Sequence, residues 1–182
     1  MKRYFFVAAT FVLIVGAAPG LVTRQDAEAQ SGTRVQSGQV VAQQPFEARL
    51  WDYLQKVNYR NWAPGPGQNG DFYEGQSPHG AFLKMYLNRT AIANPANLPN
   101  RSIVIKENYG RDRATLMAVT VMYRSQGYDP EHNDWYWVKY NPDGSVAKAP
   151  PEMGSMPLRG QVKGCIKCHA DADGGDFAFI ND

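Results

Sequence analysis

Hydrophobic positions in the first half of the chain predict one amphipathic helix. Between residues 46 and 60 the apolar side chains recur at helical intervals, at Phe46, Leu50, Tyr53, Leu54 and Val57. This spacing places them on one side of a helix, where they can pack against a core. Pro45 suits the first helical turn, because its fixed φ is already helical and its missing N–H has no intrahelical partner there.

Four later segments have the patterns typical of β-strands. In residues 81–88, Ala81, Leu83, Met85 and Leu87 alternate with Phe82, Lys84 and Tyr86. Residues 102–109, 115–124 and 135–140 alternate or are rich in β-branched and aromatic residues. Residues 63–80, with three Pro and five Gly, read as a loop. Strands joined by short connections predict an α+β fold, mainly an antiparallel β-sheet with a few short helices and one of them packed on it.

The N-terminus has the features of an export signal. Lys2 and Arg3 precede an apolar run over residues 4–16, and Ala27-Glu28-Ala29 fits the small-x-small cleavage pattern. We therefore expect a signal peptide over residues 1–29 and a periplasmic mature protein. An uncleaved membrane anchor is the alternative, although the run is short for a bilayer span. Residues 30–44 read as a flexible segment, and residues 45–182 as a single domain.

Composition narrows the class of protein. The chain has 182 residues, of which 43% are hydrophobic and 20% charged, as in a globular domain. Its formal net charge of +2 argues against nucleic acid, or a membrane surface after signal cleavage, as the main partner. Two cysteines exclude a disulfide scaffold, an all-cysteine zinc site and a cysteine-held iron–sulfur cluster within one chain.

The strongest motif is Cys165-Ile166-Lys167-Cys168-His169, which contains both cysteines of the chain. C-x-x-C-H is the attachment pattern of c-type haem. At this spacing each thiol can add across one haem vinyl group, and the adjacent His169 can coordinate the iron. Three other interpretations are a thioredoxin-like redox pair, a zinc site completed by His79 or His132, and a strained disulfide between the two cysteines.

The sixth position of the iron decides what such a haem would do. An electron carrier fills it with Met or a second His, whereas an open position binds or transforms a small molecule. The candidate ligands are Met153, Met156, His79 and His132. An aromatic wall that restricts access to small ligands could come from Phe72, Phe82 and Tyr86.

Several segments, taken in order, resemble the cytochrome P-460 family, which includes the cytochrome c′-beta group. The resemblance covers roughly residues 46–182. It rests on the His79-Gly80 turn before a strand with Tyr86, and on the segments 103–107 (IVIKE), 134–137 (DWYW) and 176–179 (DFAF) around the C-terminal haem motif.

The resemblance implies a mostly antiparallel β fold that is often a homodimer. It implies one covalently bound haem c, five-coordinate, with Cys165 and Cys168 as tethers and His169 as the proximal iron ligand. In the oxidising members a strand lysine forms a further bond to a haem meso carbon. Lys106 falls on that position and is our candidate catalytic residue, with Lys84 in reserve.

Members with this cross-link oxidise hydroxylamine and bind nitric oxide, and members without it bind nitric oxide and carbon monoxide. We therefore expect an oxidoreductase for small nitrogen compounds that passes electrons to an external acceptor such as another cytochrome c. A non-catalytic nitric oxide sensor and a six-coordinate electron carrier are the alternatives. Some active members place a carboxylate just before the motif. Residues 159–164 contain none, which leaves Glu131 or Asp134 to approach from another loop.

Overall fold

A computed structural model describes residues 35–36, 39–40 and 43–180 of the chain. The chain divides into two units, Met1–Ala42 and Gln43–Asp182. In the first unit, strand β1 (Val35–Gln36) pairs antiparallel with β2 (Gln39–Val40). The predicted signal peptide lies outside the described residues, as does much of the predicted flexible segment 30–44. The second unit contains the C-x-x-C-H motif together with the predicted helix and strands.

The predicted helix is α1, Phe46–Lys56, with Pro45 as its N-cap. Leu50 and Leu54 are buried against the sheet, as the periodicity predicts. The helix ends before residue 60, because Asn58 adopts a left-handed conformation with φ 49° and the chain continues as a 3-10 turn, η1 (Tyr59–Asn61). Tyr53 was expected on the apolar stripe but is 46% exposed, so that expectation was wrong.

All four predicted strands are present in one six-stranded antiparallel sheet, in the order β3-β4-β5-β6-β7-β8. They are β4 (Phe82–Leu87), β5 (Ile103–Tyr109), β6 (Leu116–Arg124) and β7 (Trp135–Tyr140). The sequence pattern did not reveal two further strands of two residues each, β3 (Tyr73–Glu74) and β8 (Arg159–Gly160). β3 pairs with β4, and β8 pairs with β7. The α+β architecture is therefore as predicted.

The remaining helical elements are short. α2 (Arg89–Ala93) follows β4 and is capped by Asn88, whose side chain accepts the backbone N–H of Ala91. α3 (Lys163–His169) contains the C-x-x-C-H motif. Three further 3-10 turns are η2 (Pro130–His132), η3 (Pro151–Met153) and η4 (Asp173–Gly175).

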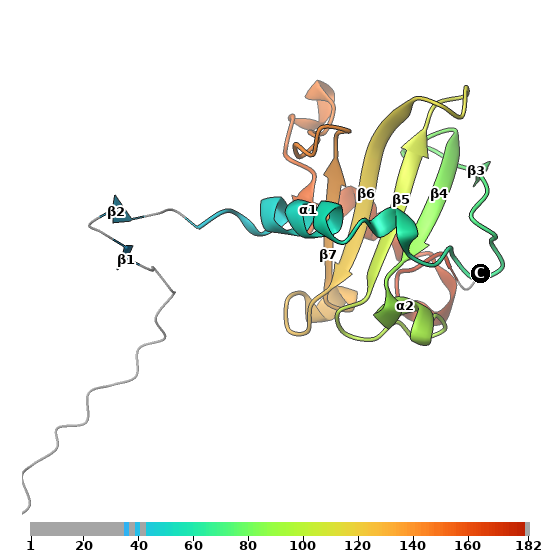
Figure 1. Ribbon diagram of the computed structural model, residues 1–182, viewed down its shortest axis with the longest axis horizontal. Coiled ribbons are helices and arrows are strands. Elements are labelled where there is room, and N and C mark those ends of the chain that lie inside the picture. Colours follow the sequence, from blue (N-terminus) through green and yellow to red (C-terminus); the bar gives the residue numbers. More distant parts are fainter. Residues whose placement is uncertain (1–34, 37–38, 41–42, 181–182) are drawn as a thin grey trace, which may run out of the picture. The chain divides into compact units, whose positions relative to one another are not determined.

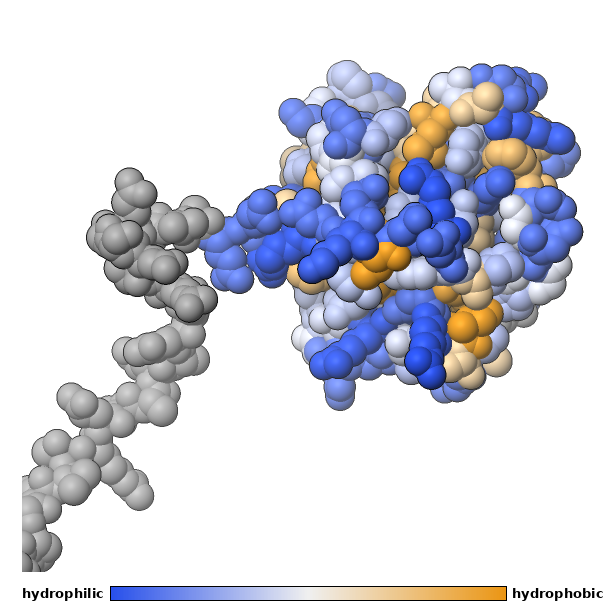
Figure 2. All heavy atoms as spheres, in the orientation of Figure 1, coloured by the Kyte–Doolittle hydropathy of each residue, from blue (hydrophilic) through white to orange (hydrophobic). Residues whose placement is uncertain are grey.

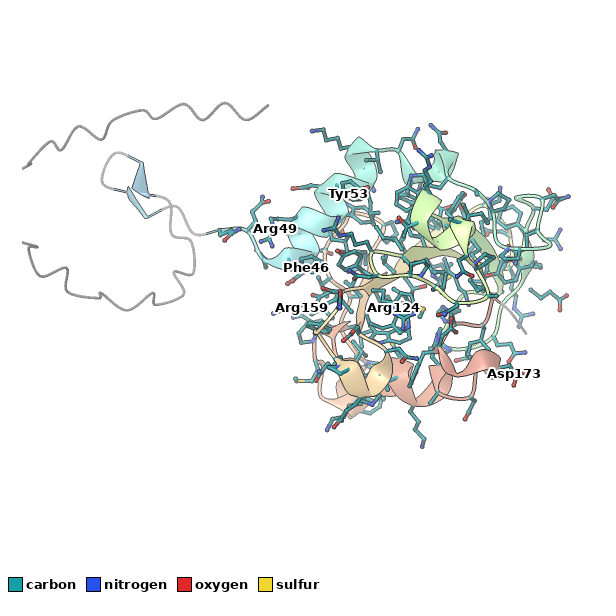
Figure 3. The ribbon with its side chains drawn as sticks, turned by 90° about the horizontal axis from the view of Figure 1, so that it is seen from below. Phe46, Arg49, Tyr53, Arg124, Arg159 and Asp173 are labelled. Carbon is teal, nitrogen blue, oxygen red and sulfur yellow. The ribbon has the colours of Figure 1, made fainter. Side chains whose placement is uncertain are left out.

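The sheet separates two hydrophobic cores. One lies beneath α1 and joins Leu50 and Leu54 to Ile105, Val119 and other residues of the central strands. The other lies on the opposite face, where Ile166 of α3 packs with the side chains of Val104, Met122, Trp135 and Trp137. Figure 1 looks onto the α1 face, and Figure 3 shows α1 with Phe46 and Tyr53 on one side of the sheet and the C-terminal segment with Asp173 on the other.

The face seen in Figure 2 is largely polar along α1, and apolar patches lie beside the helix. This matches the exposure of Arg49, Asp52, Gln55 and Lys56 on the outer side of the helix. Within the part of the chain that the structure describes, no helix is long and apolar enough to cross a membrane.

A buried carboxylate lies between η1 and the sheet. Glu107 of β5 is fully buried, and its two oxygens accept hydrogen bonds from the hydroxyls of Tyr59 (2.8 Å), Tyr86 (3.0 Å) and Tyr109 (2.9 Å). Arg60 adds a charged partner, with Nε at 2.7 Å and Nη2 at 2.6 Å from Oε1. Burial and the Glu107 charge raise the pKa of Tyr109 to about 12. The carboxylate thus ties η1, β4 and β5 together.

Substituting Glu107→Gln should lower the free energy of unfolding by about 2–4 kcal/mol, because three phenols and a guanidinium lose their charged acceptor. Denaturant unfolding measures the change. Glu131→Gln, at an exposed carboxylate, is the matched control and should change it by less than about 0.5 kcal/mol. Equal effects of the two substitutions would show that the network adds nothing to stability.

Candidate functional site

The sheet face opposite α1 carries a cavity of about 340 Å³, within the range of small-molecule and cofactor sites. It is bounded by strands β5, β6 and β7, by α3, by the turn before β4 and by the loop around η3. Its walls are mainly apolar and include Val104, Met122, Trp137, Leu158 and Val162. Lys106 and the motif residues Cys165, Cys168 and His169 line the same cavity. The structure therefore brings all four sequence-predicted site residues together.

The motif is held by the short helix α3. Ile166 is buried in the second core and anchors the helix on the sheet. Cys165 and Cys168 are three positions apart and hence share one side of the helix, facing the cavity. Both thiols are free, Cys165 half-buried and Cys168 exposed at the rim. Burial raises the pKa of the Cys165 thiol, although the positive charge of Lys139 partly opposes this.

His169 ends α3 and is buried, with its ring fixed on several sides. Its Nδ1 donates to the carbonyl oxygen of Phe177 at 2.8 Å. Trp137 and Phe179 contact the ring, with centroid separations of 4.7 Å and 5.1 Å. Desolvation lowers the pKa of His169 to about 4, and the Lys106 charge acts in the same direction. The ring is thus neutral at physiological pH, and Nε2 carries the lone pair that a metal needs.

The carbonyl that orients His169 is itself held in place. Phe177 has a positive φ of 63°, unusual for a residue with a side chain, and the segment around it is hydrogen-bonded to the loop before β7. Asn133 Nδ2 donates to the Gly175 carbonyl, and Trp135 Nε1 donates to the Asp176 carbonyl at 2.7 Å. These bonds position the Phe177 carbonyl next to Nδ1 of the imidazole.

The sheet wall of the cavity has a polar row. Lys106 of β5, Thr120 of β6 and Lys139 of β7 are directly paired in register, and all three line the cavity. Lys139 Nζ donates to the Pro78 carbonyl at 3.2 Å, and burial lowers the pKa of its amine. Lys84, the reserve candidate, pairs in register with Glu107 on the other face, where its amine lies over the Phe72 ring. The structure thus separates Lys84 from the motif.

His79 lies in the turn before β4 and also lines the cavity. Its Nδ1 is 3.0 Å from Oδ1 of Asn108, and its ring centroid is 6.3 Å from that of His169. Desolvation lowers the pKa of His79 to about 4, with the Lys106 charge as the next cause. The cavity therefore holds two imidazoles that are neutral at physiological pH and lie edge to face.

No family model matches this chain, and no curated protein is significantly similar to it. The cavity itself therefore carries the functional assignment.

Several residues that the sequence suggested for the site lie elsewhere. Phe82 and Tyr86 are on the α1 face, and Phe72 packs there against Phe82 and Tyr109, so the expected aromatic wall was wrong. Asp134 accepts the backbone N–H of Asp129 and does not line the cavity, and neither does the exposed Glu131.

The other candidates for an iron ligand are less well placed than His79. His132 Nδ1 lies 2.9 Å from Oδ2 of Asp129, and the residue lies outside the cavity. Met153 is at the cavity mouth, 66% exposed, and Met156 is 65% exposed and does not line the cavity. Because the cysteines line the cavity and His132 does not, the structure gives no support to a zinc site that His132 completes.

Sequence reasoning did not assign Trp137, Lys139 and Phe179 to the site, although Trp137 and Phe179 lie in segments that carry the family resemblance. The alternation of strand residues could have pointed to Trp137 and Lys139, because they share one face of β7 with Trp135. The other face carries Tyr136, Val138 and Tyr140. Phe179 gave no such signal, since it reaches His169 only through the return of the C-terminal segment.

The lining fits a large, flat, mostly apolar group with thioether attachment. Two thiols reach the cavity from one helix side, and an imidazole with a fixed tautomer lies beside them. Trp137 Nε1 is buried and has no hydrogen-bond partner among the described residues, which leaves a donor for an acceptor on a bound group. The residues present therefore suit a haem c.

In chain prepared without haem, a thiol reagent should modify Cys168 faster than Cys165. The thiolate is the reactive form, and burial both raises the pKa of Cys165 and restricts access to it. Peptide mass spectrometry at successive times after alkylation measures the two rates. In denaturant the two cysteines should react at similar rates. Similar rates for Cys165 and Cys168 in the folded chain as well would show that α3 is not held as described.

Proposed function

We propose that this protein is a periplasmic mono-haem c-type cytochrome of the cytochrome P-460 kind that acts on small nitrogen compounds at an open haem iron site, chiefly by oxidising hydroxylamine and binding nitric oxide. The observation that carries the proposal is the gathering of Cys165, Cys168, His169 and the distant Lys106 around one apolar cavity. A redox pair or a zinc site would need neither the apolar volume nor the lysine.

Cys165 and Cys168 are suited to tether the haem. Each thiol would add its sulfur to one carbon of a vinyl group and its hydrogen to the other, so that attachment involves no net oxidation. His169 would coordinate the iron through Nε2, because its Nδ1 donates to the Phe177 carbonyl. That bond also makes the imidazole a stronger electron donor.

The haem, when bound, supplies an iron that binds small nitrogen ligands and exchanges electrons. Oxidation of hydroxylamine to nitric oxide releases equal numbers of electrons and protons. The electrons would leave to an external acceptor such as another cytochrome c, and the protons would leave through the polar side of the cavity. The apolar wall, with Val104, Met122 and Val162, excludes bulk water and larger substrates. A homodimer belongs to the same proposal, on the family resemblance alone.

Lys106 would modify the haem. Its side chain leaves β5 on the cavity face, in the row with Thr120 and Lys139. A bond from Nζ to a meso carbon replaces one hydrogen on each atom, so this maturation step needs an oxidant of the peroxide class. The fixed register of β5 supports the assignment to Lys106, because Lys84 lies on the other face.

Nitric oxide binding without turnover is the second candidate function, and the cavity lining favours it in one respect. Among the described residues that line the cavity there is no carboxylate. The titratable lining groups besides the motif are His79, Lys106 and Lys139. Proton removal from hydroxylamine would then depend on these groups or on water, which makes a scavenger or sensor role the natural alternative.

Expression in a host with a cytochrome c maturation system should give coloured protein, cleaved after residue 29 and heavier by one haem. Cys165→Ala or Cys168→Ala should each leave one thioether, and the double variant none, whereas Ser125→Ala, at a residue that does not line the cavity, is the control and should mature normally. Intact mass spectrometry and optical spectra measure the outcome. Colourless wild-type protein at the mass of the bare chain would refute the proposal.

Lys106→Leu should remove a third covalent bond, while Lys84→Leu should not. We expect wild type and Lys84→Leu to show a strongly red-shifted ferrous Soret band, and Lys106→Leu the ordinary haem c band. Hydroxylamine turnover with an external acceptor should be lost only in Lys106→Leu, with nitric oxide binding retained. Identical spectra of the denatured haem peptides from wild type and Lys106→Leu would show that Lys106 forms no bond.

A further inference from the structure

We infer that the α1 face of the sheet carries a second ligand site, which binds a small aromatic carboxylate. The site is a cavity of about 360 Å³, close in size to the one beside the motif but on the opposite side of the sheet. It lies between the first half of α1, the start of α2, the start of β5 and the end of β6. The inference does not use the haem, so it holds or fails independently of the proposed function.

The apolar lining of this cavity suits one flat ring. Leu50 and Ile103 belong to the core beneath α1 and form its buried floor. Phe46, Tyr53 and Tyr123 add three aromatic rings, of which the first and third lie 5.5 Å apart at an angle of 36°. Because the volume is near the lower limit for small-molecule sites, the cavity fits a compact ligand rather than an extended one.

The sequence of α1 departs here from a pattern made only for packing. Phe46, Arg49, Leu50 and Tyr53 follow one another at i, i+3, i+4 and i+7, and all four line the cavity. A helix face that only packs on a core has apolar residues at such positions, and Arg49 is not one. Figure 3 shows Phe46, Arg49 and Tyr53 on this helix. The 46% exposure of Tyr53 is therefore that of a residue at the edge of a cavity.

Two guanidinium groups give the cavity a positive charge. Arg49 of α1 and Arg101, two residues before β5, both line it, and none of the described lining residues is acidic. The buried glutamates of this face, Glu47 and Glu107, are each paired with another arginine that does not line the cavity. The lining therefore contains two cations and no anion, which favours an anionic ligand.

The backbone holds both arginines beside the cavity. Arg101 has a positive φ of 71°, a conformation that costs free energy in a residue with a side chain. Its N–H donates to the Arg124 carbonyl at 2.9 Å, and its carbonyl accepts Nδ2 of Asn88 at 2.9 Å, so two hydrogen bonds maintain that conformation. Arg49 donates from Nη1 to the Gln44 carbonyl. A guanidinium has five N–H donors, so Arg49 keeps donors for a ligand.

An organic carboxylate fits these features better than an inorganic anion. Guanidinium groups bind carboxylate and phosphate in the same planar, bidentate way. Inorganic phosphate would leave the apolar floor and the three rings in contact with water, whereas a ring attached to a carboxylate covers them. Benzoate is a simple molecule with both parts and serves as the probe.

Isothermal titration of the exported full chain with benzoate tests the inference. Wild type should bind one benzoate per chain, and Arg49→Gln and Arg101→Gln should each weaken binding about tenfold, because each loses a charge-assisted hydrogen bond. Arg111→Gln removes the same charge from an exposed residue that does not line the cavity and should bind as wild type does. Denaturant unfolding of Arg49→Gln should match that of wild type, which excludes lost folding as the cause.

Two further probes separate the charge from the ring. Benzamide has the ring without the charge, and inorganic phosphate has the charge without the ring, so each should bind about tenfold more weakly than benzoate or less. Absence of saturable benzoate binding, equal binding by Arg101→Gln and Arg111→Gln, or equal affinity for benzamide or phosphate would overturn the inference. Benzoate should leave the haem spectrum of the matured protein unchanged, and a shifted Soret band would place the bound benzoate at the iron instead.

Discussion

The buried carboxylate of Glu107 sets the register of β5, and the site depends on that register. Three tyrosine hydroxyls and Arg60 hold Glu107 on the α1 face. Because successive strand residues point to opposite faces, its neighbours Lys106 and Asn108 must point to the cavity. A slip of one residue would bury Lys106 beneath α1 and move Glu107 into the cavity, at a high cost in free energy for both charges.

The same register organises the polar side of the cavity. Asn108 uses its amide to join β5 to the adjoining β6 and, through its oxygen, fixes the Nδ1–H tautomer of His79. On the other side, the Phe177 carbonyl fixes the same tautomer of His169. Two segments far apart in the sequence thus place imidazoles on one cavity, each with its Nδ1 held by a hydrogen bond.

The cavity bears on two roles that the sequence left as alternatives. A sixth ligand from the chain is typical of an electron carrier, and an open iron is typical of a protein that binds small molecules. In the structure His79 lines the same cavity as His169, next to exposed residues of a surface turn. The paired residues Lys106, Thr120 and Lys139 form the polar part of the otherwise mainly apolar cavity wall.

Local pattern determined the four main strands, the helix beneath them and the motif, because strand alternation and helical periodicity are short-range properties of the chain. The C-x-x-C-H spacing likewise determined which residues would share one side of α3. Only the tertiary structure decided that Lys106 and not Lys84 lies with the motif, that His79 lies beside His169, and that Trp137 and Phe179 contact the imidazole. Those relations depend on which face of the sheet α1 covers and on the path of the C-terminal segment, and both follow from long-range packing that no local spacing encodes.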